Sequence, residues 1–175
     1  MNSGHNLEKV LTTTEKDNRW WQGKRGEWYV IIQALIFLLL IFGPGAASQT
    51  GSARPITSAG GALLLLAGLI LAVAGTYNLG KNLTPLPFPK DNAEFIASGA
   101  YRLVRHPIYG GIAIMAFGWS LWLHNWLKLI YAVLLFVFFI VKSHREEAWL
   151  MVKFPAYAVY KKSVRRLIPY LFLYY

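Results

Sequence analysis

Residues 107–141 read PIYGGIAIMAFGWSLWLHNWLKLIYAVLLFVFFIV, two apolar stretches, 107–123 and 126–141, that only His124 and Asn125 separate. Apolar stretches of this length predict helices that enter a membrane. Two helices joined by two residues have to run antiparallel. We therefore predict a helical hairpin whose open ends, Pro107 and Val141, lie at the same level.

Two further apolar stretches precede the hairpin, at 28–47 and 59–79. A bilayer core of ~30 Å needs about 17–25 helical residues. The first two stretches fit this length, whereas the two of the hairpin are short and would each use a flanking turn. The predicted fold is an all-α integral membrane bundle of about four transmembrane helices, followed by a C-terminal cytoplasmic or interfacial helix.

The predicted organisation has a polar N-terminal arm, 1–27, and a membrane-embedded domain, 28–175. The 27 mostly polar residues that precede the first apolar stretch argue against a cleaved signal peptide. No fixed repeat is found, and the length of 175 residues suggests one domain.

The composition excludes several classes of protein. The chain is 55% hydrophobic and carries a formal net charge of +10 without any cysteine. Unbroken apolar runs argue against a soluble nucleic-acid binder, and the apolar fraction argues against a disordered tail. Without cysteine there is no disulfide framework, no Cys-ligated metal and no cysteine nucleophile. The four histidines lack the spacing of metal ligands, so no metal site is predicted.

The basic residues predict the orientation in the membrane. Sixteen of the 18 Lys and Arg side chains fall on one side of the predicted bundle, and only Arg54 and Lys128 fall on the other. Cytoplasmic loops carry an excess of Lys and Arg. We therefore expect both termini and the 80–106 loop to lie in the cytoplasm.

Glycines recur every seven residues in the second and third apolar stretches. They are Gly61, Gly68 and Gly75 in one stretch, and Gly111 and Gly118 in the other. Small residues on one helix face allow close helix packing in lipid. We interpret these glycines as packing positions.

Two polar segments interrupt the apolar pattern and would meet at the open end of the hairpin. The spacing brings Arg105, His106 and Tyr109 to the level of residues 145–147, Arg-Glu-Glu. The arginines could be ordinary membrane anchors, and Tyr109 could be an interfacial aromatic. Two acidic residues directly after a span are costly unless they have partners, and they favour recognition of a polar ligand. A solvated helix face remains the alternative.

Two other features lie near this end. Prolines at positions 85, 87 and 89 exclude a regular helix or strand in that segment. The segment is either a lid over the cytoplasmic mouth or a simple linker. Tyr157 and Tyr160 lie three residues apart, on one side of a predicted helix, and would either pack or face a ligand.

These motifs resemble those of the isoprenylcysteine carboxyl methyltransferase and phospholipid methyltransferase superfamily. The similar residues, over roughly 79–170, are Arg105-His106-Pro107-x-Tyr109, then Arg145-Glu146-Glu147-x-x-Leu150-x-x-x-Phe154-x-x-Tyr157-x-x-Tyr160, then Arg166-x-x-Pro169. The segment Asn82-Leu-Thr-Pro-x-Pro-x-Pro resembles bacterial members. The chain has Phe154-Pro155 where the family usually has Phe-Gly, which puts the local turn in question.

The resemblance implies a small helical membrane enzyme that uses S-adenosyl-L-methionine without a Rossmann domain. The cofactor pocket would face the cytoplasm, between the last hairpin and the C-terminal helix, in a prokaryotic plasma membrane. The implied cofactor-binding residues are Tyr101, Arg105, His106, Tyr109, Gly110, Arg145, Glu146 and Glu147. The implied catalytic residues are Arg105, His106 and Arg166.

The implied roles suit the chemistry of the residues. Glu146 or Glu147 could bind the cofactor's ammonium group, and Arg105 or His106 its carboxylate. Tyr101 and Tyr109 could face the sulfonium or stack on adenine. Arg166 could bind an anionic substrate head. His106 could accept the proton of an amine acceptor, whereas a carboxylate acceptor needs no base.

Two other functions stay open. Membrane sterol reductases resemble the same C-terminal half and use NADPH, but they are typically larger and have more spans. A non-enzymatic membrane protein could keep the same scaffold for interactions only. The identity of the methyl acceptor also stays open. It could be prenylcysteine, a phospholipid amine, or another hydrophobic acid or thiol.

Overall fold

The computed structural model describes residues 26–45 and 54–168. The elements are α2 (Glu27–Phe42), α3 (Arg54–Leu79), α4 (Pro107–Trp122), α5 (Trp126–Lys153) and α6 (Tyr157–Ser163), with 3-10 turns at Gly80–Asn82 and Gly99–Arg102. Within the described residues no strand forms, and the one β-bridge joins Val104 to Arg165. The all-α prediction is confirmed for this part of the chain. Almost all of the predicted arm 1–27 lies outside the described residues, as does Pro169.

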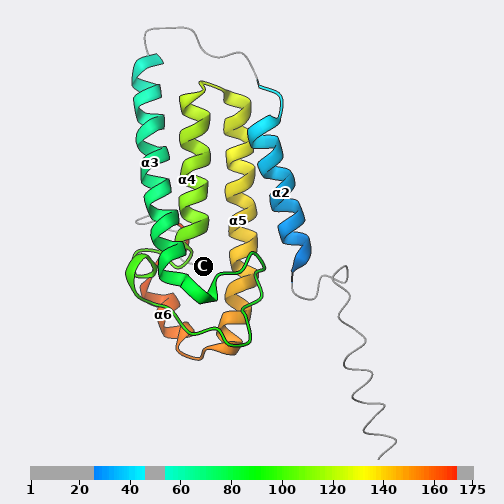
Figure 1. Ribbon diagram of the computed structural model, residues 1–175, viewed down its shortest axis with the longest axis vertical. Coiled ribbons are helices and arrows are strands. Elements are labelled where there is room, and N and C mark those ends of the chain that lie inside the picture. Colours follow the sequence, from blue (N-terminus) through cyan, green and yellow to red (C-terminus); the bar gives the residue numbers. More distant parts are fainter. Residues whose placement is uncertain (1–25, 46–53, 169–175) are drawn as a thin grey trace, which may run out of the picture.

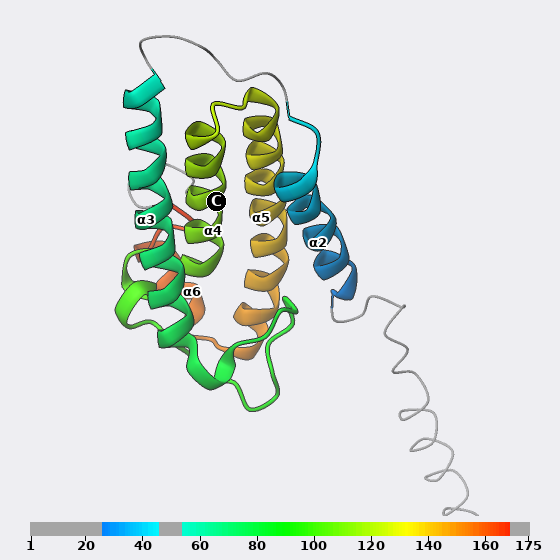
Figure 2. The ribbon, with the colours of Figure 1, turned by 45° about the horizontal axis from the view of Figure 1, so that its top comes forward.

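Four long helices lie side by side in the order α3, α4, α5, α2 (Figures 1 and 2). The hairpin predicted from 107–141 is confirmed as α4 and α5. Asn125 begins α5, because its side-chain oxygen accepts from the backbone N–H groups of Leu127 and Lys128 at 3.1 Å each. His124, in the connecting turn, has a φ of 52°. Its ring is held by the hydroxyls of Thr57 and Ser58 at 2.9 Å each.

The glycine prediction is also confirmed, since all five glycines lie where α3 crosses α4. A Cβ at Gly68 would lie 2.5 Å from the carbonyl oxygen of Gly111, and a Cβ at Gly118 would lie 2.7 Å from that of Gly61. At the lower end of the interface, a Cβ at Gly75 would lie 2.8 Å from the ring of Pro107. Backbone contact of this kind holds α4, and with it the start of the polar segment, tightly against α3.

Two predicted helix boundaries were wrong. The first apolar stretch was expected to run to residue 47, but α2 ends at Phe42. Pro44 explains this end, since the residue before a proline avoids the helical region, and Gly43 has a ψ of 160°. Helix α3 begins at Arg54 rather than at residue 59, because Pro55 suits the first helical turn.

In the part of the chain that the structure describes, two helices are long and apolar enough to cross a membrane, Pro55–Asn82 and Trp126–Lys153. Helices α2 and α4 have 16 residues each. At ~1.5 Å per residue they measure about 24 Å, less than the ~30 Å of a bilayer core. The structure thus supports a membrane protein, and the count of four crossings stays a prediction.

Helix α5 continues well past the apolar stretch that ends at Val141, as far as Lys153. Its last turns therefore project beyond the bundle, where they meet α6, the start of α4 and the 83–98 segment (Figure 1). Phe154 is extended before Pro155, and α6 begins at Tyr157. The departure from the family pattern at Phe154-Pro155 is thus a proline-made break between α5 and α6.

Candidate active site

The chain after α6 returns beside the start of α4. The backbone N–H groups of Arg105 and His106 donate to the carbonyls of Arg165 and Arg166 at 2.7 and 2.9 Å. Pro107 then begins α4 with a residue that has no N–H to satisfy. This returning segment crosses α4 so closely that a Cβ at Gly110 would collide with the carbonyl of Leu167.

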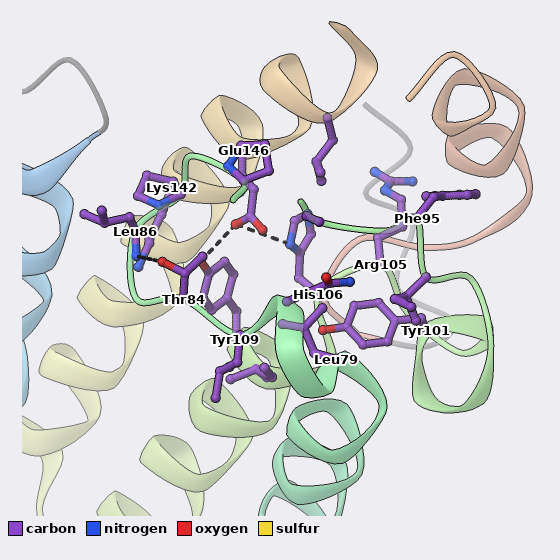
Figure 3. A pocket seen from close by; sticks show the side chains of 18 of the residues that line it. Leu79, Thr84, Leu86, Phe95, Tyr101, Arg105, His106, Tyr109, Lys142 and Glu146 are labelled. Carbon is purple, nitrogen blue, oxygen red and sulfur yellow. Dashed lines mark hydrogen bonds and ion pairs between the residues drawn. The ribbon is translucent and has the colours of Figure 1, made fainter. Parts of the chain in front are cut away.

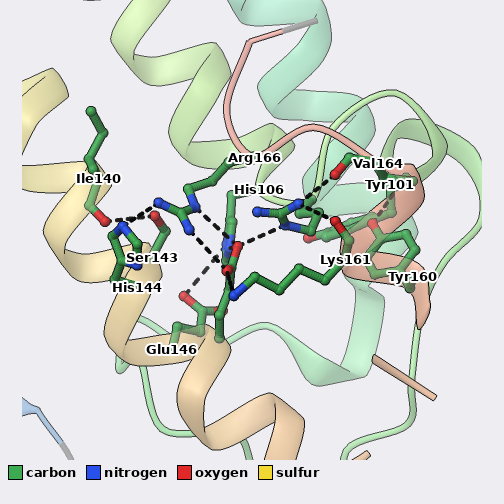
Figure 4. A network of polar contacts seen from close by, with 12 residues as sticks. Tyr101, His106, Ile140, Ser143, His144, Glu146, Tyr160, Lys161, Val164 and Arg166 are labelled. Atoms are coloured by element: carbon green, nitrogen blue, oxygen red, sulfur yellow. Dashed lines mark hydrogen bonds and ion pairs between the residues drawn. The ribbon is translucent and has the colours of Figure 1, made fainter. Parts of the chain in front are cut away.

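Glu147, on α5, is the centre of a buried ionic cluster (Figure 4). Its Oε1 accepts from Arg105 Nε at 2.8 Å and lies 3.3 Å from both His106 Nε2 and Arg166 Nε. Its Oε2 lies 3.3 Å from Arg166 Nη2 and 3.5 Å from Lys161 Nζ. One carboxylate therefore joins the start of α4, the end of α5, α6 and the returning chain.

The cluster keeps Glu147 ionised. The carboxyl lies beyond the apolar stretch of α5 and is 1% exposed. Burial alone would raise its pKa. The hydrogen bond with His106 and the charges of the two guanidinium groups outweigh burial, and they hold the pKa well below its ordinary value of 4.5.

A cavity of about 340 Å³ opens next to this cluster (Figure 3). Its walls come from α2, the 79–96 segment, η3 (Gly99–Arg102), α4, the end of α5 and α6. The polar and aromatic residues that line it beyond the 79–89 segment are Gln33, Glu94, Phe95, Tyr101, Arg105, His106, Tyr109, Lys142, Glu146, Phe154, Tyr157 and Tyr160. Concave sites of this size, mostly apolar with a few convergent polar groups, are typical of small-molecule binding.

Glu146 is the carboxylate that lines the cavity from α5. The Tyr109 hydroxyl donates to its Oε2 at 2.9 Å, and His106 Nδ1 lies 3.8 Å from the same oxygen. The rings of His106 and Tyr109 are stacked with centroids 5.5 Å apart, and the ring of Phe139 is stacked on Tyr109 with centroids 4.9 Å apart. Packing of Tyr109 against these two rings thus fixes the hydroxyl that bonds to Glu146.

Aromatic rings line the end of the cavity near α6. The ring of Phe95 meets the ring of Tyr160 edge-on, with ring centroids 5.5 Å apart. Its centroid lies 5.9 Å from that of Phe154 and 6.1 Å from that of Tyr157. The Tyr160 hydroxyl donates to the Tyr101 carbonyl at 2.5 Å. Burial raises the pKa of the Tyr157 and Tyr160 phenols well above their ordinary value, so both stay protonated at neutral pH.

The proline-containing segment covers the cavity, and it forms neither helix nor strand. Two hydrogen bonds between Asn82 and Glu94 join the two sides of this segment. The Asn82 side-chain oxygen accepts from the Glu94 backbone N–H at 3.1 Å, and the Asn82 side-chain nitrogen donates to the Glu94 carbonyl at 2.8 Å. Lys153, at the end of α5, donates to the Asp91 carbonyl at 2.8 Å. The predicted position over the mouth is confirmed, and movement as a lid stays a prediction.

The structure brings together most of the predicted site residues and separates them into two groups. Tyr101, Arg105, His106, Tyr109 and Glu146 line the cavity. Glu147 and Arg166 lie behind this wall, in the ionic cluster, and Arg166 Nη1 also meets His144 Nε2 at 2.5 Å.

Two predicted site residues lie elsewhere. Arg145 was expected to lie beside Arg105, His106 and Tyr109. It is exposed instead, and its guanidinium lies 4.9 Å from the ring centre of Trp149. It projects from another face of α5 than Glu146. Gly110 was expected to contact the cofactor, but it is the crossing point of the returning chain. The structure places neither residue in the lining of the cavity, because a motif gives residue order and not the rotation of the helix.

Sequence reasoning missed Lys142, Gln33 and Phe95 as cavity residues. Lys142 precedes Glu146 by four residues, so both lie on one face of α5, and that spacing could have identified it. Gln33 and Phe95 come from segments far away in the chain, and no comparable spacing points to them.

Two buried polar atoms at the cavity lack hydrogen-bond partners in the part of the chain that the structure describes. They are Arg105 Nη2 and the Tyr157 hydroxyl. Both residues line the cavity and are 4% and 3% exposed. Buried polar atoms are rarely left unsatisfied, so a polar ligand group at this position would complete the site.

Comparison with known proteins agrees with the residue pattern. A family model for phospholipid methyltransferase matches residues 56–156, which is more than half of the chain. The match takes in α3, the covering segment, α4 and α5, and it ends before α6 and Arg166. No curated protein matches the chain. The chain belongs to the phospholipid methyltransferase family, part of the isoprenylcysteine carboxyl methyltransferase superfamily.

Proposed function

We propose that the chain transfers a methyl group from S-adenosyl-L-methionine to a lipophilic acceptor, in the cavity beneath the 83–98 segment. Membership in a methyltransferase family supports the reaction class. The observation that carries the proposal is that one cavity is lined both by a carboxylate, Glu146, and by an arginine, Arg105, whose buried Nη2 has no partner among the described residues.

The residues fit this cofactor. Glu146 is fixed by Tyr109 and can accept hydrogen bonds from an ammonium group. The free Nη2 of Arg105 and the Tyr157 hydroxyl can donate to a carboxylate. The rings of Phe95, Tyr157 and Tyr160 offer flat apolar surface for a nucleobase. A volume of about 340 Å³ lies within the ~300–1,000 Å³ of small-molecule sites.

When bound, S-adenosylmethionine supplies a methyl group on a positively charged sulfur. The side chains of the cavity orient the two reactants, which is the main contribution needed for an in-line displacement. A carboxylate acceptor requires no base. With an amine acceptor, the His106 ring, supported by Glu146 at 3.8 Å, is the group placed to take the proton.

Glu147 acts through its neighbours in this proposal. Its carboxylate accepts a hydrogen bond from Arg105 Nε. A second Arg105 nitrogen, Nη1, donates to the carbonyls of Lys161 and Val164 at 2.8 and 2.5 Å. Arg105 is therefore fixed with one nitrogen left for a ligand. Arg166 is 2% exposed and bonded to Glu147, so we assign it to positioning rather than to an acceptor's head group.

The cavity would lie at the cytoplasmic surface of a prokaryotic plasma membrane. It adjoins the ends of α4 and α5 that continue the apolar stretches, and the positive-inside pattern assigns this end to the cytoplasm. A lipid acceptor could then approach within the plane of the membrane, with its head group at the level of the cavity.

The test is methyl transfer by the purified full-length protein in bilayers of bacterial lipid, with S-adenosylmethionine that is tritiated on the methyl group. We expect label in the lipid extract from the wild-type protein and a loss of at least about tenfold in Glu146→Gln. Hydride transfer from tritiated NADPH without methyl transfer would instead identify a reductase. Absence of both activities, with unchanged S-adenosylhomocysteine binding in Glu146→Gln, would favour a non-enzymatic protein.

A further inference from the structure

A buried lysine at the cavity wall has no role in the proposed reaction so far. Lys142 is 1% exposed and lines the cavity. Its Nζ donates to Gln33 Oε1 at 2.7 Å and to the Pro85 carbonyl at 3.2 Å, and it lies 5.0 Å from the ring centre of Tyr109. All three partners are uncharged. Among the described residues no carboxylate oxygen lies within 4 Å of this ammonium group.

A buried ammonium without a counter-charge in contact is unfavourable, because transfer from water costs several kcal/mol per ion, and the neutral acceptors together with the more distant charge of Glu146 recover only part of it. The ammonium has three N–H donors, and two of them have acceptors within the protein. An anion in the cavity would supply both the missing charge and the third acceptor. The arrangement thus points to an anionic ligand group at Lys142.

The position of Lys142 separates this group from the cofactor. Figure 3 shows Lys142 at one end of the cavity with Thr84 and Leu86, and Arg105 at the other end with Tyr101 and Phe95. Glu146 lies between the two cations. The cofactor's carboxylate has its own donor in Arg105 Nη2, so the Lys142 end remains for the second reactant.

The depth of Lys142 identifies the kind of reactant. Lys142 directly follows the apolar stretch 126–141, which places its ammonium where a bilayer changes from hydrocarbon to head groups. The apolar side chains of Ile108 and Ile112 line the same cavity from α4. An acyl or prenyl chain can lie along them while its head group reaches the lysine.

We propose that Lys142, oriented by Gln33, binds the anionic oxygens of the methyl acceptor's head group, a carboxylate or a phosphate, and that the acceptor is therefore an anionic lipid. This inference rests on the proposed methyl transfer only for the identity of the second reactant. Selection of an anion at Lys142 is measurable without turnover.

The experiment compares amphiphiles that share one oleyl chain: oleate, oleyl phosphate, oleylamine and oleyl alcohol. Their binding to the full-length protein in neutral detergent is measured by competition with radiolabelled oleate, with and without saturating S-adenosylhomocysteine. The wild-type protein should prefer at least one anion over the alcohol by about tenfold or more. The oleate and oleyl phosphate arms distinguish a carboxylate acceptor from a phosphate-bearing one.

Three variants isolate the charge. Lys142→Met should lose the preference for anions, and Lys142→Arg should keep most of it. Gln33→Glu keeps the lysine and adds a competing carboxylate, so it should also weaken anion binding while oleyl alcohol binds as before. Lys128→Met is the matched control, because Lys128 is buried in the other half of α5 and donates to the Leu40 carbonyl at 2.7 Å. This control should keep the anion preference.

Several results would overturn the inference. One is a wild-type protein without anion preference, and another is an unchanged preference in both Lys142→Met and Gln33→Glu. A third is a Lys142→Met protein that binds S-adenosylhomocysteine more weakly but methylthioadenosine, which lacks the amino-acid end, equally well. That result would assign Lys142 to the cofactor. Failure of the wild-type protein to bind S-adenosylhomocysteine would count against the proposed function alone, since the anion preference is measured separately.

Discussion

Two neighbouring carboxylates, Glu146 and Glu147, lie in different surroundings because successive residues on a helix point in different directions. Glu146 faces the cavity and receives one hydrogen bond from Tyr109, whereas Glu147 faces the cluster of basic side chains and is 1% exposed. The motif alone left both residues as candidates for the same role. Under the proposed function, ligand binding falls to the first and support of the site to the second.

Loss of the Glu147 charge should cost stability. Glu147→Gln leaves the buried guanidinium groups of Arg105 and Arg166, and the partly exposed ammonium of Lys161, around a neutral amide. Breaking a buried ion pair from one side costs about 3–5 kcal/mol. Thermal unfolding in detergent should show a clear fall in Tm for Glu147→Gln and a much smaller one for Glu146→Gln, the matched control. Equal Tm values for the two variants would contradict the assignment.

The same variant predicts a pH dependence. The folded-state pKa of Glu147 lies below its ordinary value of 4.5, so the ionised carboxylate stabilises the fold above that value and loses this effect as the pH falls further. The stability difference between wild type and Glu147→Gln should therefore shrink as the pH falls below 4.5. Denaturation measured across this range checks it, and a difference that grows on acidification would refute it.

Helix packing depends on where along α3 a glycine lies. Gly68 touches the backbone of α4, whereas a Cβ at Gly60 meets nothing within 4 Å. Gly68→Ala should destabilise the protein by roughly 1–3 kcal/mol through overpacking. Gly60→Ala should cost nothing, because alanine favours a helix over glycine. Unfolding of the two variants in one detergent decides the matter: a Gly68→Ala protein as stable as Gly60→Ala would mean that α3 and α4 are not in backbone contact.

The elements that were predictable are those that local sequence determines. The two-residue turn at His124 and Asn125 forces the hairpin, and that turn alone brings the 105–109 segment to the level of Glu146. The seven-residue glycine spacing gave the α3–α4 interface for a similar reason. Helix ends were less predictable where a proline such as Pro44 acts on the residue before it.

The cavity itself could not be derived in full, because its walls come from segments that are distant in the chain. Gln33 on α2 reaches Lys142 across 109 residues, and Arg105 reaches the carbonyl of Val164 across 59. Contacts of this range depend on how whole helices are rotated and placed. The path of the covering segment likewise depends on hydrogen bonds between Asn82 and Glu94, which no sequence pattern predicts.

At the scale of the whole molecule, the α4–α5 turn and the covering segment lie at opposite ends of the bundle (Figure 1). The chain has no cysteine, so single cysteines can report their side of the membrane without background. Asn92→Cys should react with an impermeant maleimide only from the cytoplasmic side, and Leu123→Cys only from the other. Reaction of both from the same side would rule out that α4 and α5 cross the membrane.

In the proposed function, Glu146 and Arg105 close around one molecule of S-adenosylmethionine at the end of the bundle. Isothermal titration of the purified full-length protein with S-adenosylhomocysteine tests it most directly. We predict binding of one equivalent by the wild-type protein, at least about tenfold weaker binding by Glu146→Gln, and unchanged binding by Lys128→Met. No heat of binding at millimolar ligand, or equal affinity in Glu146→Gln and wild type, would contradict the account.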